Sequence, residues 1–166
     1  MKTGLVAFAF GVPYSTTANR EIARIVTECA SENPMPVFTQ KDIQINLAGL
    51  DIAMCAEAEQ SPPTLRIARA SVKWAQKKEL KQLKIIAAVP HVWRCKRDLE
   101  AAVLESGAKI NVSIIESIYE VESSLWFDPN GVQRRAQSWS KWWWASHRNE
   151  LLLRAIPFSI YRHIAN

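Results

Sequence analysis

Glycine is scarce in this chain, which has five glycines among 166 residues. None of them belongs to a GxGxxG or GxxxxGK(S/T) motif, so the sequence has neither the dinucleotide fingerprint nor a P-loop. HExxH motifs, GxSxG motifs and paired-carboxylate patterns are missing as well. These absences exclude the motif-defined metallopeptidases, serine hydrolases and P-loop enzymes, and the sequence names no cofactor.

Cysteine is also sparse, and the three residues Cys29, Cys55 and Cys95 are widely spaced. No CxxC pair occurs, and no Cys/His cluster has the spacing of zinc ligands. An odd number of separated cysteines predicts reduced thiols in a cytoplasmic protein. We expect no metal site, and we expect Cys95 in the core because it fits an apolar helical stripe.

Long apolar segments are missing too. The run near the N-terminus extends only from Leu5 to Val12 and has no clean cleavage site after it. A helix that spans a membrane needs about 18–20 apolar residues. We therefore expect a buried first strand here, and neither secretion nor membrane insertion.

The order of strand-like and helix-like segments predicts an α/β fold. Continuous apolar runs such as Leu83–Val89 are typical of strands that are covered on both faces. Thr16 or Thr17 can cap the first helix, and Gly107 can end the last. We predict a single Rossmann-like domain with a mostly parallel sheet and helices on both faces. The predicted strands are Leu5–Val12, Val37–Thr39, Asp51–Ala56, Leu83–Val89 and Asn111–Ile118, and the predicted helices are Ala18–Glu32, Thr64 to about Lys78, and 92–106.

Two regions are less regular. In residues 40–60, Ile43, Ile45 and Leu47 alternate with polar residues, so a strand and an extended loop both remain open. From Ser123 the pattern changes again. The sequence therefore predicts an α/β core over 1–122 and a C-terminal helical extension over 123–166, packed on that core.

Hydroxyl and basic side chains follow several predicted strands. Because carboxyl ends of parallel strands share one sheet edge, we expect these groups to converge there and form an anion-binding crevice with helix N-termini. Arg94 would hold a phosphate or carboxylate, and His91 would supply a proton or a hydrogen bond. Simple helix capping and a structural histidine explain the same residues one at a time. The candidate ligand-binding residues are Ser15, Thr16, Ser61, Thr64 and Arg94, and the candidate catalytic residue is His91.

These residues carry a resemblance. Ser61-x-x-Thr64 opens a helix, a strand follows, and His91-x-x-Arg94 comes next. In these features, and in a first strand that runs into Gly11, residues 4–118 resemble the YdcF/SanA-like domain family. The resemblance implies a Rossmann-like fold with a pocket for a nucleotide-like ligand. Some relatives are linked to S-adenosylmethionine or to the cell envelope.

The chain departs from the family pattern at three places. Arg66 and Ile67 stand where the family has Glu and Asn, and Ala58 stands at an acidic position. Thr39-Gln40-Lys41 replaces a glycine-rich strand end. The resemblance therefore implies a fold and a pocket, and it leaves catalysis open.

Five of the seven tryptophans lie in the last quarter of the chain, interleaved with arginine and lysine. A long helix over about 132–156 is expected, with a short helix after Pro157. A helical stripe packed on the sheet is the favoured interpretation. Successive helical residues turn by about 100°, so at least one of Trp142, Trp143 and Trp144 must face solvent or an interface. Self-association as a homodimer, membrane-surface contact and nucleic-acid stacking stay open.

Two functional hypotheses follow. The net charge of +5 suits phosphorylated ligands. The first hypothesis is a cytoplasmic protein that binds an anionic, nucleotide-like small molecule at the sheet edge, with group transfer or hydrolysis as its reaction if it is an enzyme. The alternative is a non-catalytic interaction protein that works through its Trp/Arg-rich C-terminal helix.

Overall fold

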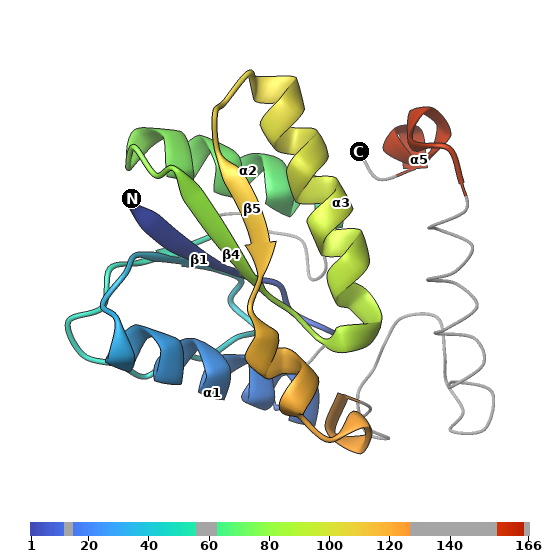
Figure 1. Ribbon diagram of the computed structural model, residues 1–166. Helices are drawn as coiled ribbons and strands as arrows, with labels where there is room; N and C mark the ends of the chain where they lie inside the picture. Colours follow the sequence, from blue (N-terminus) through green and yellow to red (C-terminus); the bar gives the residue numbers. More distant parts are fainter. Residues whose placement is uncertain (12–14, 56–62, 127–155, 165–166) are drawn as a thin grey trace.

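The computed structural model describes residues 1–11, 15–55, 63–126 and 156–164 (Figure 1). Its centre is a five-stranded sheet with the order β3-β2-β1-β4-β5. Every neighbouring pair is parallel, which confirms the predicted α/β class. The strands are β1 (Thr3–Ala7), β2 (Val37–Thr39), β3 (Ile52–Met54), β4 (Gln82–Ile86) and β5 (Asn111–Ile114).

Helices cover both faces of the sheet. Helix α1 (Thr17–Glu32) lies on one face, and helices α2 (Thr64–Lys77) and α3 (Val89–Ser106) lie together on the other (Figure 1). Right-handed crossovers explain this division. The chain moves from β1 to β2 in one direction along the sheet, and from β3 to β4 to β5 in the opposite direction, so the connecting helices fall on opposite faces.

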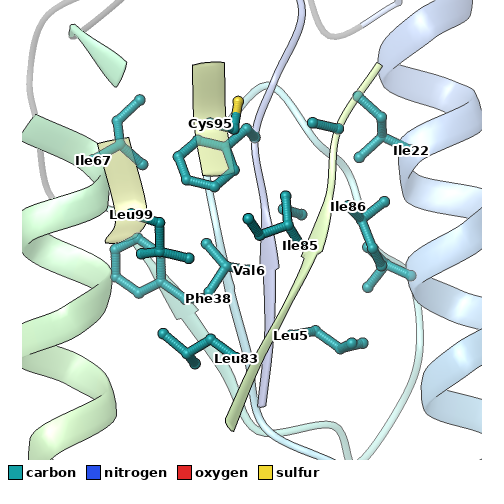
Figure 2. Packing of buried hydrophobic residues seen from close by; sticks show 14 of the residues in the cluster. Leu5, Val6, Ile22, Phe38, Ile67, Leu83, Ile85, Ile86, Cys95 and Leu99 are labelled. Atoms are coloured by element: carbon teal, nitrogen blue, oxygen red, sulfur yellow. The ribbon is translucent and has the colours of Figure 1, made fainter. Parts of the chain in front are cut away.

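The core lies on both sides of β1 and β4. Figure 2 shows Ile22 of α1 and Ile67 of α2 on opposite sides of these strands. Leu5 and Ile85 are fully buried between the two layers. Cys95 is also fully buried, as expected from its place in the apolar stripe of α3.

The predicted strands are too long at their carboxyl ends. β1 ends at Ala7, β4 at Ile86 and β5 at Ile114. Beyond β1 and β4, Phe8 and Ala87 are fully buried without belonging to the strands. An apolar run in the sequence indicates which residues are buried. Burial continues past the last strand residue because helix N-termini cover the sheet edge. The predicted strand Asp51–Ala56 is likewise shorter, since β3 ends at Met54.

Of the ambiguous residues 40–60, those between β2 and β3 form a loop and not a strand. It contains Ile43, which is fully buried, and its backbone N–H donates to the Gln40 carbonyl at 3.0 Å. Ile45 and Leu47 are half-buried and pack against the core. The alternation in the sequence therefore reflects an extended loop lying on the core.

Two short 3-10 helices follow β5, namely η1 (Glu116–Glu120) and η2 (Ser123–Trp126). They lie beside α1, and Trp126 is buried in the main core (Figure 1). The predicted helix over 132–156, with the tryptophan cluster, lies outside the described residues. The short helix expected after Pro157 is confirmed as α5 (Phe158–Ile164). None of the helices in the described ranges is long and apolar enough to cross a membrane.

Candidate functional site

The carboxyl ends of β1 and β4 form a topological switch point. These two strands are neighbours, but the helices that follow them, α1 and α3, lie on opposite faces of the sheet. Open α/β sheets bind ligands in the crevice outside such a point, because the two outgoing connections diverge there. A ligand site is therefore expected among the residues of this edge.

The connection after β1 is held by side chains from two other elements. Asn19, which is 1% exposed, accepts from the Phe10 N–H at 2.9 Å and donates to the Gly11 carbonyl at 3.0 Å. The Gln40 side chain accepts from the Ala9 N–H at 2.8 Å. Gly11 has φ 81°, a conformation that favours glycine. These contacts fix the backbone after β1 at the switch point, and neither Asn19 nor Gln40 was among the predicted site residues.

Thr16 is the N-cap of α1, and its hydroxyl accepts from the Asn19 N–H at 3.3 Å. The side chain is buried by this role. Ser15 next to it is exposed at the same sheet edge. Of the two hydroxyls predicted here, Ser15 faces solvent while Thr16 holds the start of the helix.

Helix α2 begins at Thr64, as the sequence predicted. The N-cap is Pro63, which supplies no side-chain hydrogen bond, and Thr64 is the buried first residue of the helix. Ser61, the residue expected to cap it, lies outside the described residues. Helix α3 begins in the same way at Ala88, again with no side-chain cap. Two helix N-termini at this edge thus have no side-chain acceptor at the cap position.

His91 and Arg94 form a contact pair in the first turns of α3. The helix begins at Val89, so His91 lies inside it and does not precede it as the sequence suggested. Arg94 Nη2 lies 2.9 Å from His91 Nδ1. A guanidinium can only donate, so Nδ1 accepts and the ring proton sits on Nε2. This tautomer makes His91 a neutral hydrogen-bond donor at Nε2.

The ring of His91 is 5% exposed and is in tilted contact with the Phe10 ring, at 5.7 Å between centroids. Phe10 in turn is held by Asn19. These contacts connect three parts of the switch point. They are the connection after β1, the start of α1, and the His91–Arg94 pair. Thr64 lies at the same edge, at the start of α2.

One buried carboxylate was missed by the sequence analysis. Asp98 is fully buried on α3 and accepts from the Tyr161 hydroxyl of α5 at 2.6 Å, while Arg97 donates to it at 3.3 Å. Burial raises the pKa of Asp98, although Tyr161, Arg97 and Arg94 oppose that shift. Burial and the Asp98 charge raise the pKa of Tyr161, so its hydroxyl stays protonated and donates. The signal was present in the sequence, because Asp98 falls in the apolar stripe of α3 about two turns after His91.

Within the part of the chain that the structure describes, no group of three or more His, Cys, Asp or Glu side chains could hold a metal ion. All three cysteines are free. At the switch point Arg94 donates to His91, while the side-chain oxygens of Thr16, Asn19 and Gln40 accept from backbone N–H groups.

Comparison with known proteins adds no relative: no protein-family model, no curated protein and no solved structure matches this chain. The resemblance to the YdcF/SanA-like domain family stays a prediction.

Thr16 offers a direct test of its capping role. Thr16→Ala should lower the free energy of unfolding by about 1 kcal/mol, because the N–H of Asn19 loses its acceptor. Thr16→Ser keeps the hydroxyl and should stay within a few tenths of a kcal/mol of the parent chain. Urea unfolding followed by circular dichroism measures both values. Equal losses in the two variants would contradict capping.

Asp98 should make stability depend on pH in a defined direction. Its pKa in the folded protein is raised above the ordinary value of 3.8, so its contribution to stability is present at low pH and is lost as pH rises through the raised pKa. Asp98→Asn removes this titration. The measurement is scanning calorimetry of both chains. We expect the difference in Tm, parent chain minus Asp98→Asn, to decrease as the pH is raised from 4 to 7. A difference that is constant or rises would be the contrary result.

Proposed function

We propose that this protein binds a small anionic, nucleotide-like molecule at the carboxyl edge of the sheet, between the connection after β1 and the start of α3. The observation that carries the proposal is the His91–Arg94 pair at the switch point, with 2.9 Å between Nδ1 and Nη2. The free thiols of Cys29, Cys55 and Cys95 favour a cytoplasmic location for this activity.

The donor groups suit a phosphate or carboxylate. Arg94 is a planar guanidinium that only donates, and its contact with His91 Nδ1 places it at the switch point. The Nε2–H of His91 is a second donor. The starts of α2 and α3 add the positive ends of two helix dipoles, and neither Pro63 nor Ala88 places a side-chain acceptor at them.

The tautomer of His91 bears on the reaction. Its Nδ1 lone pair is engaged by Arg94 and its Nε2 carries the proton, so the neutral His91 ring donates a hydrogen bond and is neither a general base nor a general acid in this state. Binding is therefore the core of the proposal. Group transfer or hydrolysis would use Arg94 to hold negative charge and the His91 Nε2–H to hydrogen-bond the leaving group.

Arg94 is the first residue to test. ATP, coenzyme A, S-adenosylmethionine and glucose 6-phosphate are added separately to the full chain, and Tm is followed. A ligand at a hundredfold excess over its Kd should add about 2.7 kcal/mol, or roughly 5–10 °C. Arg94→Gln should lose this shift.

The matched control is Arg24→Gln, which removes the same charge from α1, where Arg24 pairs with Glu21 and Glu28. It should respond like the parent chain. If a ligand raises the Tm of Arg94→Gln as much as that of the parent chain, the proposed site at Arg94 is contradicted. A chain that responds to none of the four ligands would favour the interaction-protein hypothesis, which rests on the tryptophan-rich residues outside the described ranges.

His91 allows a finer test, because Asn and Gln each imitate one ring nitrogen. His91→Gln keeps a donor near the Nε2 position, whereas His91→Asn keeps an acceptor near Nδ1 and loses the Nε2 donor. We expect His91→Asn to weaken ATP binding by roughly 10- to 100-fold in titration calorimetry, and His91→Gln to weaken it less. The reverse order would assign ligand contact to Nδ1.

A further inference from the structure

The C-terminal helix α5 is held on the protein by contacts separate from the main core. Tyr161 of α5 and Leu65 of α2 form a small hydrophobic cluster of their own, with Ile156 and Phe158 packed around it. Figure 1 shows α5 beside α3, on the outer side of that helix layer. This cluster is distinct from the core around β1 and β4, so α5 rests on a separate set of buried side chains.

The contact is nevertheless specific for a tyrosine. The Tyr161 side chain is 2% exposed, and its hydroxyl donates to the fully buried Asp98 carboxylate at 2.6 Å. The Arg97 guanidinium lies 4.0 Å from the centroid of the Tyr161 ring. A cation over the ring and a carboxylate at the hydroxyl recognise both ends of a phenol. An apolar anchor would need neither group.

Arg94 connects this position to the switch point. On helix α3, Arg94 lies one turn after His91 and one turn before Asp98, so the three side chains share one face. Its guanidinium lies 2.9 Å from His91 Nδ1. Arg94 also acts to lower the pKa of both Tyr161 and Asp98, as a guanidinium beside the 2.6 Å Tyr161–Asp98 pair would. The Tyr161 oxygen can accept from a guanidinium while its proton goes to Asp98. The Arg94 guanidinium is therefore close to groups on two separate elements.

We propose that α5 controls the anion site: docked, it holds Arg94 in place through the Tyr161 hydroxyl, and undocked, it leaves Arg94 free to move. The inference rests on the proposed function. Tyr161 is a positioning residue, since it acts on the ligand through Arg94. A long, flexible side chain that is already ordered loses less conformational entropy when the ligand binds. Linkage requires the converse effect, so a bound ligand stabilises the docked helix by the same factor.

The test removes one oxygen atom. Tyr161→Phe keeps the ring between Leu65 and Arg97 but loses the hydroxyl. ATP affinity is measured by titration calorimetry, and docking is measured by hydrogen exchange of the α5 amides on the full chain. Tyr161→Phe should weaken ATP binding by on the order of tenfold. ATP should slow hydrogen exchange of the α5 amides in the parent chain, with a much smaller effect in Tyr161→Phe.

The matched control is Tyr119→Phe, which removes the hydroxyl of a half-exposed tyrosine on η1. It should change neither the ATP affinity nor the exchange of the α5 amides.

A second arm needs no ligand. The second arm is a double-mutant cycle, read out as the hydrogen-exchange rate of the α5 amides. Its members are the parent chain, Arg94→Gln, Tyr161→Phe and the double variant. We expect each single change to speed exchange, and the double variant to fall short of the product of the two effects, since both remove one contact. Purely multiplicative effects would overturn the inference. So would ATP binding that is lost in Arg94→Gln but unchanged in Tyr161→Phe, although the proposed function would then stand. If the parent chain does not bind ATP, both the proposed function and the inference about α5 are contradicted for this ligand.

Discussion

Parallel pairing of β1 with β4 is the constraint on which the rest of the structure depends. The two strands align from Thr3 opposite Gln82 to Ala7 opposite Ile86, and both lie in the centre of the sheet. Their connections leave in opposite directions, and handedness then places α1 on one face and α3 on the other. The switch point at their carboxyl ends is a consequence of that divergence. Any group on the connection after β1 or in the first turn of α3 is brought to it.

Helix α3 carries an unusual amount of polarity into a buried face. Its inward residues include His91 and Asp98 beside Val92, Cys95 and Leu99. Burying an ionised carboxylate costs free energy unless other groups compensate it. Here the compensation comes from Tyr161 on a helix far along the chain and from arginines on α3 itself. The same groups that make Asp98 tolerable also tie α5 to Arg94, so docking of the C-terminal helix and the geometry of the switch point share one network.

Sequence signals predicted the helix ends correctly where the interaction involves residues close together in the chain. Thr16 caps α1 because a hydroxyl at that position satisfies a free N–H of the first turn, and Gly107 ends α3 with φ 65° because glycine tolerates that conformation. The strand ends were predicted less well. Phe8 and Ala87 continue their apolar runs past the last strand residues, since hydrophobicity follows burial; the Phe8 N–H still donates to the Ile86 carbonyl at 3.0 Å.

By itself, the sequence determined the α/β class, the order of the elements and the convergence of His91 and Arg94 at one sheet edge, because periodicity, caps and strand order act over short distances. Only the tertiary structure decided the tautomer of His91, which depends on the 2.9 Å contact with Arg94. It also decided that Asn19 and Gln40 hold the connection after β1, and that Asp98 receives its hydrogen bond from Tyr161. These partners are distant in sequence, and no pattern along the chain encodes which side chains meet once the sheet and its helices have packed.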